Sequence, residues 1–204
     1  MQYLGLAKKQ SHPVVCFHCV SVGEVLTSIP LIKKYQQQHP QQKILITTTT
    51  FTGYQEVKKA FENKVEHRFM ALDFILFSKL FFSSNNIIAL NIIETELWPN
   101  LLQQAKKNNI PITLINARLS ARSTKRYLKL SRTARWLVNH IDNLLAQHQD
   151  DAQRFIQLGV SPEKITITGS IKFDINIDPE KQKLGEALKN KLSHSPVVLA
   201  DKHS

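Results

Sequence analysis

Short apolar runs alternate with segments of helical periodicity along most of this chain, and this rhythm restricts the fold more than any other feature of the sequence. The predicted strands are Val14–Cys19, Lys43–Thr48, His67–Met70, Ile87–Ile93, Pro111–Asn116, Asn143–Ala146 and Lys164–Thr168. The predicted helices are Glu24–Gln38, Gly53–Asn63, Phe74–Phe82, Trp98–Asn108, Ser123–Asn139, Asp150–Leu158 and Pro179–Lys191. Strands that alternate with helices in this way indicate an α/β fold, in which a parallel sheet carries helices on both faces.

In a sheet of this kind, ligands bind at the carboxyl ends of the strands, in the loops that lead to the helices. The polar residues of interest fall in such loops: Val20–Gly23, Thr47–Gly53, Ala71–Asp73, Glu94–Pro99, Asn116–Ser120, Gln147–Asp150 and Gly169–Asp174. A last apolar run, Pro196–Ala200, has the composition of one more strand. It either pairs with the preceding sheet or begins a further part of a longer protein.

The composition excludes several other classes of protein. With 6 Gly and 8 Pro in 204 residues, the chain is neither collagen-like nor of low complexity. No run approaches the ~18 apolar residues that a membrane span requires, and Met1–Ser11 lacks the apolar block of a secretory signal.

Cys16 and Cys19 form a C-x-x-C pair inside an apolar, β-prone run. Residues three apart in a strand point to opposite faces, so we interpret the two as buried structural thiols. A redox pair and half of a metal site remain alternatives. Two reduced cysteines fit the cytosol.

The net charge of +11 is concentrated in one segment. Between residues 101 and 140 the chain has no Asp or Glu, and its basic residues are Lys106, Lys107, Arg118, Arg122, Lys125, Arg126, Lys129, Arg132 and Arg135. Several of them recur at steps of four and three, which places them on one stripe wherever the segment is helical. A block of one sign predicts an anionic partner: phosphate, nucleic acid or an anionic membrane.

Three loops contain carboxylates or a lysine that could perform chemistry. In Ser21-Val22-Gly23-Glu24, the glycine allows a ligand to approach the backbone, and the helix N-terminus favours the charged form of Glu24, which could accept a proton. Glu94 and Glu96 leave the end of a buried strand together and suit acid–base work or a divalent metal. Lys172 follows Gly169 and offers a positive charge to an anion. Each of these residues could instead be an ordinary helix cap, ion pair or exposed loop residue.

The segment Phe74–Phe82 is apolar almost all the way round a helix. Such a helix is buried in a core, or it presents an apolar surface to a lipid or a partner.

Five motifs stand in order along the chain. They are His18-Cys19-Val20-Ser21-Val22-Gly23-Glu24, Thr47-Thr48-Thr49 with Thr52-Gly53, Glu94-Thr95-Glu96-Leu97-Trp98-Pro99-Asn100, Asn116-Ala117-Arg118-Leu119-Ser120 and Thr168-Gly169-Ser170-Ile171-Lys172-Phe173-Asp174. Together, from about Val14 to about Asp174, they resemble the N-terminal half of the 3-deoxy-D-manno-octulosonic acid (Kdo) transferases, the lipid A glycosyltransferases of Gram-negative bacteria.

The resemblance implies a GT-B glycosyltransferase of two Rossmann-like domains, in which the N-terminal domain binds the acceptor lipid IV-A and the C-terminal domain binds the donor CMP-Kdo. It implies that Glu24 is the general base, that Glu94 and Lys172 stabilise the transition state, and that the reaction inverts the anomeric centre. No cofactor or metal is implied. We expect the substrate contacts to include Ser21, Gly23, Thr52, Gly53, Glu96, Arg118, Arg122 and Arg126.

On this reading, residues 1–178 are the Rossmann-like acceptor-binding domain, and residues 179–204 are a linker helix and the start of a donor-binding domain that is missing. We therefore expect the chain alone to be inactive. The family acts at the cytoplasmic face of the inner membrane, although its N-terminal anchor is absent before Met1. The assignment of the basic segment to phosphates and of Phe74–Phe82 to acyl chains is our hypothesis from charge and hydropathy.

The sequence departs from the family at Phe51, where the Thr-rich loop commonly has a proline, and at Ala71-Leu72, which replaces a proline-aromatic pair before Asp73. Three alternatives remain: another GT-B transferase with a nucleotide-sugar donor, a non-catalytic remnant that binds anionic lipid, and a nucleic-acid binder. We expect no nucleic-acid partner, because the chain lacks clustered base-stacking aromatics.

Overall fold

The computed structural model describes residues 10–70 and 72–171. Its strands are β1 (Val14–His18), β2 (Lys43–Thr48), β3 (Glu66–Phe69), β4 (Ile87–Ile93), β5 (Ile112–Ala117), β6 (Asn143–Ala146) and β7 (Ile165–Ile167). Its α-helices are α1 (Val22–Gln38), α2 (Phe51–Phe61), α3 (Ile75–Ser84), α4 (Pro99–Lys107), α5 (Ala121–Lys129), α6 (Ser131–Val138) and α7 (Gln149–Leu158). A short 3₁₀ turn, Pro162–Lys164, precedes β7.

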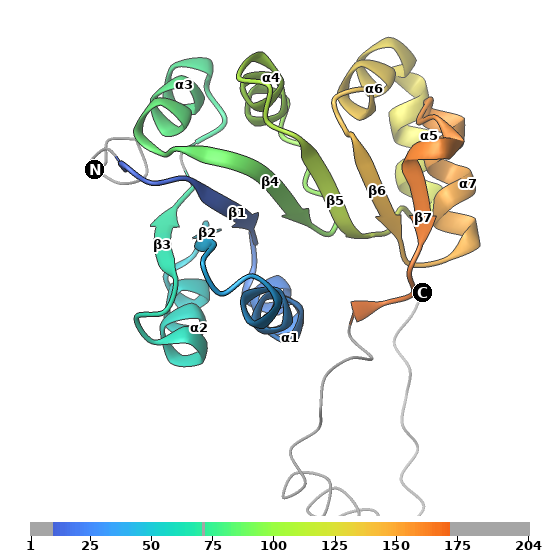
Figure 1. The fold of residues 1–204 in the computed structure, drawn as a ribbon. Coiled ribbons are helices and arrows are strands. Elements are labelled where there is room, and N and C mark those ends of the chain that lie inside the picture. The colour runs from blue at the N-terminus through green and yellow to red at the C-terminus, as the bar shows by residue number, and fades with distance from the viewer. Residues whose placement is uncertain (1–9, 71, 172–204) are drawn as a thin grey trace, which may run out of the picture. The chain divides into compact units, whose positions relative to one another are not determined.

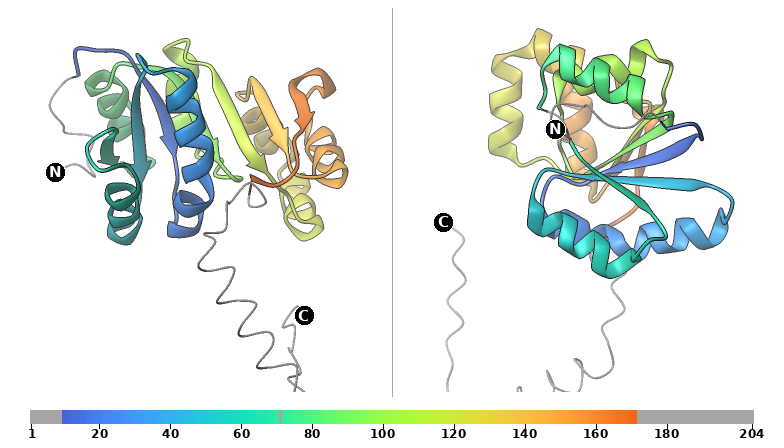
Figure 2. Two further views of the ribbon diagram at one scale, coloured as in Figure 1. Left: turned by 60° about the horizontal axis from the view of Figure 1, so that its bottom comes forward. Right: turned by 90° about the vertical axis from the view of Figure 1, so that its left-hand side faces the viewer.

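The seven strands form one sheet in the order β3-β2-β1-β4-β5-β6-β7, and every neighbouring pair is parallel. Helices α1 and α2 cover one face, and α3 and α4 lie on the opposite face (Figures 1 and 2). The predicted α/β class, with a parallel sheet and helices on both faces, is confirmed. The order is that of a Rossmann-like sheet.

The core has a cluster on each side of the sheet. One joins residues of α1 and α2, such as Val25 and Phe61, to the inner strands, and the other joins residues of α3, α4, α6 and α7 to the opposite face. Cys16 belongs to the second cluster and Cys19 to the first, as strand alternation predicts. Both thiols are free and buried, and burial raises the pKa of each to about 12, so they are inert packing groups.

The direction of winding reverses between β1 and β4. From β1 the chain passes to β2 and β3 on one side, whereas β4 begins the series that runs to β7 on the other. In open α/β sheets the binding crevice lies at this switch point, outside the carboxyl ends of the strands. Glu24 follows β1 and Glu94 follows β4, so the topology brings two of the predicted catalytic residues to the same place.

The predicted helix Ser123–Asn139 is wrong as one continuous element. It is two helices, α5 and α6, separated at Leu130, whose φ and ψ are −113° and 48°. The bend turns Ala134, Leu137 and Val138 into the core while α5 remains at the surface with only Thr124 buried. The basic residues therefore do not form one stripe, because the bend separates those of α5 from those of α6.

The apolar segment Phe74–Phe82 is buried at one end and exposed at the other, so the interpretation as a buried helix holds for its C-terminal end only. Phe81 and Phe82 are buried in the core, but Phe74 is 62% exposed and the next two residues, Ile75 and Leu76, are also exposed. Helix α3 is therefore a core helix whose N-terminal end presents apolar side chains to the surroundings.

Some expectations lie outside the described residues. They are Lys172, the domain boundary at 178–179, the helix Pro179–Lys191 and the strand Pro196–Ala200. Within the described part of the chain, none of the helices combines the length and apolar character needed to cross a bilayer.

Candidate active site

Glu24 is placed by a capping arrangement at the start of α1. Ser21 is the N-cap, and its Oγ accepts the Glu24 N–H at 3.2 Å while donating to Glu24 Oε1 at 2.8 Å. The Val20 N–H donates to the other carboxylate oxygen, Oε2, at 2.7 Å. A Ser at the N-cap and a Glu three residues later are the sequence signature of a capping box, which explains why the chain folds this way here.

Glu24 is buried, with only 6% of the residue exposed. Burial raises its pKa, the hydrogen bonds from Ser21 and Val20 oppose that rise, and the nearby charges of Glu96 and Glu94 add to it. The favourable effect of the helix N-terminus is therefore not the largest influence on Glu24: desolvation outweighs the local donors, and the pKa of the carboxyl group lies above its ordinary value. A carboxylate with a raised pKa is the stronger base once it is ionised.

Glu94 stands directly after β4 with its backbone at a φ of 60°. Asn116, at the end of the neighbouring strand β5, has the same φ of 60°. Asparagine tolerates this left-handed region, but glutamate adopts it only at a cost of roughly 1 kcal/mol or more. Strain of this kind at adjacent strand ends is typical of functional sites.

The carboxylate of Glu94 pairs with Arg118. Arg118 Nε lies 3.5 Å from Glu94 Oε2, and the Thr95 hydroxyl donates to the Arg118 carbonyl. The loop after β4 is thus joined to the loop after β5. Arg118, which the sequence predicts to contact the substrate, therefore lies next to Glu94.

Glu96 is held by Trp98, whose Nε1 donates to Glu96 Oε2 at 3.1 Å. Trp98 in turn packs edge-on against the buried ring of His18, with the ring centroids 5.1 Å apart. His18 Nδ1 lies 3.0 Å from Thr47 Oγ1, and burial lowers the pKa of His18 to about 3, so the ring is neutral. Neither His18 nor Trp98 has a predicted role, and their presence in two of the five motifs is the only sequence signal for them.

Thr52 and Gly53 lie at the start of α2. The Gly53 N–H is used by the N-cap, donating to Thr50 Oγ1 at 3.1 Å, and the Thr52 hydroxyl donates to the same oxygen at 3.4 Å. Thr49 Oγ1 donates to the Val20 carbonyl at 2.7 Å, which joins this loop to that of Glu24. A Cβ on Gly53 would lie 3.0 Å from Thr50 Oγ1, which is too close for most side chains. Packing against Thr50 therefore accounts for this glycine without the expected substrate contact.

Gly23 is different, because nothing within the part of the chain that the structure describes requires a glycine there. It is exposed, and the nearest atom to a Cβ built there is Ser21 Oγ at 3.8 Å. Glycine in a helix costs roughly 0.5–1 kcal/mol relative to alanine. The absence of a side chain at Gly23 therefore leaves space next to Glu24 that a ligand could occupy.

The remaining predicted site residues lie on α5 and after β7. Arg122 and Arg126 are exposed on α5. The residue before Lys172, Ile171, donates its N–H to Asn116 Oδ1 at 3.2 Å, which fixes that part of the loop to the end of β5. Among residues 10–70 and 72–171, no group of three or more His, Cys, Asp and Glu side chains is placed to hold a metal ion.

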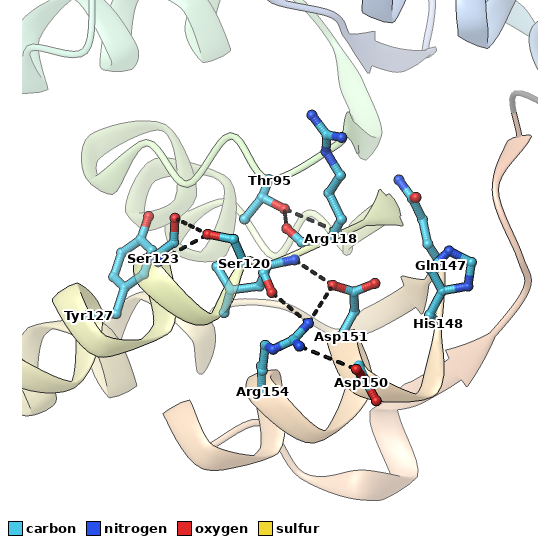
Figure 3. A pocket seen from close by; sticks show the side chains of 11 residues that line it. Thr95, Arg118, Ser120, Ser123, Tyr127, Gln147, His148, Asp150, Asp151 and Arg154 are labelled. Atoms are coloured by element: carbon cyan, nitrogen blue, oxygen red, sulfur yellow. Dashed lines mark hydrogen bonds and ion pairs between the residues drawn. The ribbon is translucent and has the colours of Figure 1, made fainter. Parts of the chain in front are cut away.

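A hollow of about 720 Å³ opens beside Arg118, between the loop after β5 and the start of α7 (Figure 3). Tyr127 and Ser123 lie on one side of it and Gln147 and His148 on the other. The hollow cannot be predicted from the sequence, since α7 and the loop after β5 meet only in three dimensions.

The site therefore offers the buried carboxyl group of Glu24, two further carboxylates and an arginine at the carboxyl ends of adjacent strands. This arrangement suits removal of a proton from a bound hydroxyl group.

Comparison with known proteins identifies relatives of the chain. Residues 1–175 match the model of the family described as 3-deoxy-D-manno-octulosonic-acid transferase (kdotransferase). The 3-deoxy-D-manno-octulosonic acid transferase of Haemophilus influenzae is 39% identical over 166 residues, which are 81% of this chain and 39% of that protein. The chain thus spans about two fifths of the length of this relative.

Two solved structures share the fold. UDP-GlcNAc 2-epimerase from Neisseria meningitidis bound to UDP-GlcNAc superposes with a TM-score of 0.61 at 16% identity, covering 93% of this chain and 56% of that one. A lipopolysaccharide outer core galactosyltransferase superposes with a TM-score of 0.52 at 9% identity, covering 76% of this chain and 45% of that one. At these identities the likeness concerns the fold alone, which is shared with GT-B glycosyltransferases and epimerases.

Proposed function

This chain belongs to the 3-deoxy-D-manno-octulosonic acid (Kdo) transferase family, and we propose that it supplies the acceptor-binding half of an enzyme that transfers Kdo from CMP-Kdo to lipid IV-A. The observation that carries the proposal is the position of Glu24. It lies buried at the switch point between β1 and β4, beside the carboxylates that follow β4.

On this proposal Glu24 is the general base. Each of its oxygens accepts one hydrogen bond from the chain, Oε1 from Ser21 and Oε2 from Val20, so each keeps a lone pair for a ligand. A sugar hydroxyl of the acceptor gives its proton to this carboxylate as its oxygen attacks the anomeric carbon of Kdo. The bond from that carbon to the phosphate oxygen breaks with inversion, and CMP leaves with the electron pair.

Glu94 and Lys172 stabilise the charge that develops on the Kdo ring and on the departing CMP. Glu94 is held by strained backbone and by its pairing with Arg118, so it is fixed in place before the substrate binds. Gly23 and Ser21 border the acceptor hydroxyl, and Thr52, Gly53 and Glu96 belong to the loops around it.

The surroundings suit a phosphorylated lipid. Exposed Arg122 and Arg126 on α5 bind its phosphates, and the exposed end of α3 at Phe74 contacts its acyl chains. These two surfaces also favour work at the anionic cytoplasmic face of the inner membrane.

GT-B enzymes hold the donor in their second domain, so on this proposal the 204 residues alone do not turn over CMP-Kdo. A chimaera tests this, in which residues 1–175 replace the corresponding segment of the Haemophilus influenzae relative. The chimaera should add Kdo to lipid IV-A, measured by mass spectrometry, while the 204 residues alone should not. A folded chimaera that binds CMP-Kdo but leaves lipid IV-A unmodified would contradict the proposal.

A further inference from the structure

Trp98 occupies a position at which the start of a helix favours a different residue. It is the N-cap of α4, where Ser, Thr, Asp and Asn are preferred because their side chains accept the first N–H groups of the helix. The side chain of Trp98 makes no such bond. Asp73, from the loop before α3, caps the helix in its place, accepting the N–H of Asn100 at 3.2 Å and that of Leu101 at 2.9 Å. The start of α4 therefore does not account for the tryptophan.

The indole of Trp98 instead connects two other side chains. Its Nε1 donates to Glu96 Oε2 at 3.1 Å. Its ring lies edge to face with that of His18, with the centroids 5.1 Å apart and an interplanar angle of 74°. His18 is wholly buried at the end of β1, and its Nδ1 lies 3.0 Å from Thr47 Oγ1, at the end of β2. Contacts thus run from the ends of β1 and β2, through Trp98, to a carboxylate in the loop after β4.

His18 is also a residue that the fold alone does not favour. Its Nε2 is buried and has no hydrogen-bond partner among residues 10–70 and 72–171. A buried polar atom without a partner destabilises the folded chain, and such atoms are normally paired. His18 and Trp98 are in contact, and each departs from a rule of local stability. Departures of this kind are expected where a residue serves function and not folding.

The same contacts connect Glu96 to the loop of Glu24. His18 is followed two residues later by Val20, whose N–H donates to Glu24 Oε2 at 2.7 Å. Thr49, from the loop after β2, donates to the Val20 carbonyl at 2.7 Å. The loops after β1, β2 and β4 are therefore joined by side-chain contacts of the chain itself, and these contacts hold Glu24 and Glu96 in place before a substrate binds.

The carboxylate of Glu96 keeps one oxygen available. In the described part of the chain, the hydrogen bond that reaches it comes from Trp98 and goes to Oε2. Oε1 therefore retains its lone pairs for a ligand, and the residue is half-buried, so the side chain is accessible from outside. A carboxylate that one donor holds in a fixed orientation is a strong and directional acceptor for a hydroxyl group.

We infer that Trp98 is a positioning residue, which holds Glu96 so that Oε1 accepts a hydrogen bond from a hydroxyl group of the bound acceptor, and that His18 holds Trp98 in turn. The inference rests on the proposed function, which supplies the acceptor. A carboxylate fixed before binding loses less conformational entropy when the substrate arrives.

A double-mutant cycle in the chimaera tests the inference. Trp98→Phe keeps a ring against His18 and removes the N–H, whereas Glu96→Ala removes the group through which Trp98 acts. Each single variant should lower kcat/KM for lipid IV-A about ten-fold, and the double variant should be no worse than Glu96→Ala, because Trp98 then has nothing to position. Trp136→Phe, the same substitution at an exposed position of α6, is the matched control and should leave the kinetics unchanged. Losses that multiply in the double variant, or full activity in a folded Trp98→Phe chimaera, would overturn the inference.

The indole N–H signal tests the contact without any change to Trp98. The chain has two tryptophans, so the 204-residue chain with Trp136→Phe has a single indole signal in its amide NMR spectrum. A hydrogen bond to a carboxylate moves this signal downfield, so adding Glu96→Ala should move it upfield. A signal that stays in place would mean that Glu96 does not accept from Trp98, and the inference would be wrong.

The two proposals fail separately. A chimaera that transfers Kdo, but in which the losses of Trp98→Phe and Glu96→Ala multiply, would keep the proposed function and remove the positioning role. A chimaera that is inactive on lipid IV-A would contradict the proposed function, whereas the indole signal would still decide whether Trp98 holds Glu96.

Discussion

The hydroxyl of Ser21 and the side chain of Glu24 hold one another: Ser21 Oγ donates to Glu24 Oε1 at 2.8 Å and accepts the Glu24 N–H at 3.2 Å. The same contact begins helix α1 and fixes the rotamer of the proposed base. Folding and the proposed function therefore involve the same pair of side chains, and substitutions must be chosen so that the two roles can be told apart.

Glu24→Gln removes the base and keeps its shape. We expect kcat of the chimaera to fall on the order of 10²–10⁴-fold, as for loss of a general base. Burial raises the pKa of Glu24, so above that pKa the buried charge destabilises the folded chain. At neutral pH the glutamine variant should therefore unfold at the same temperature or a higher one. In the parent enzyme the rate should rise with pH as Glu24 ionises, and this limb should vanish in the variant.

Ser21→Ala is the matched control for Glu24→Gln. It removes the cap but leaves the carboxylate, so it should cost about 1 kcal/mol of unfolding free energy and lower kcat much less. A fully active Glu24→Gln chimaera would refute the general-base role.

Gly23→Ala tests whether Gly23 is needed for substrate binding or for stability of the fold. Among residues 10–70 and 72–171, the atom nearest to a Cβ at this position is 3.8 Å away, and alanine is the better helix former by roughly 0.5–1 kcal/mol. We expect thermal unfolding at the same or a higher temperature and at least a ten-fold loss of kcat/KM for lipid IV-A. Gly53→Ala should behave in the opposite way, losing stability first, since its Cβ would crowd Thr50 and Thr48. Equal acceptor kinetics in Gly23→Ala would contradict the prediction.

Glu94→Gly tests whether the left-handed backbone of Glu94 stores strain. At a φ of 60° glycine is relaxed, so the unfolding free energy should rise by up to about 1 kcal/mol, measured by denaturant titration. Transfer by the chimaera should fall sharply. Glu94→Gln, which keeps the Cβ, should lose activity without gaining stability. A stabilised glutamine variant would point to charge instead of backbone strain.

Stability at acid pH should depend on His18. Burial lowers its pKa from 6.5 to about 3, so between these values the unfolded chain takes up a proton that the folded chain refuses. Stability from this group is complete above pH 6.5 and falls toward pH 3, by at most roughly 1.4 kcal/mol per pH unit. In His18→Asn, whose amide oxygen can still accept from Thr47, the unfolding free energy should decline less steeply over this range. His67, with a pKa of about 4, contributes in the same direction in both proteins, so identical slopes would exclude His18.

Hydrophobic periodicity predicted the strands and most helices well. Each short apolar run must pair its backbone within the sheet, and this fixes the strands. The break at Leu130 was not predictable in this way. No Gly or Pro lies between residues 121 and 138, and Leu130 is 67% exposed, so the bend comes from packing of Ala134 and Leu137 onto the core and not from a local signal.

The candidate site shows the same limit. Glu24 and Glu94 could be assigned from their loops, since parallel strands end at one edge of the sheet. The network from His18 through Trp98 to Glu96, and the clamp of Asp151 on Leu119, depend on side chains that meet across separate loops. The rise in the pKa of Glu24 likewise follows from burial in three dimensions.

Reversal of two charges on α5 tests the surface proposed for the lipid. Arg122→Glu with Arg126→Glu changes exposed side chains on a helix without acidic residues. Since a basic residue near an anionic bilayer contributes about 1 kcal/mol, binding of the 204-residue chain to vesicles containing lipid IV-A should weaken at least ten-fold in a sedimentation assay. Lys58→Glu with Lys59→Glu, on exposed positions of α2, makes the same change of charge elsewhere and should have a much smaller effect. Equal loss in both double variants would mean that net charge, and not the α5 surface, governs attachment to the lipid.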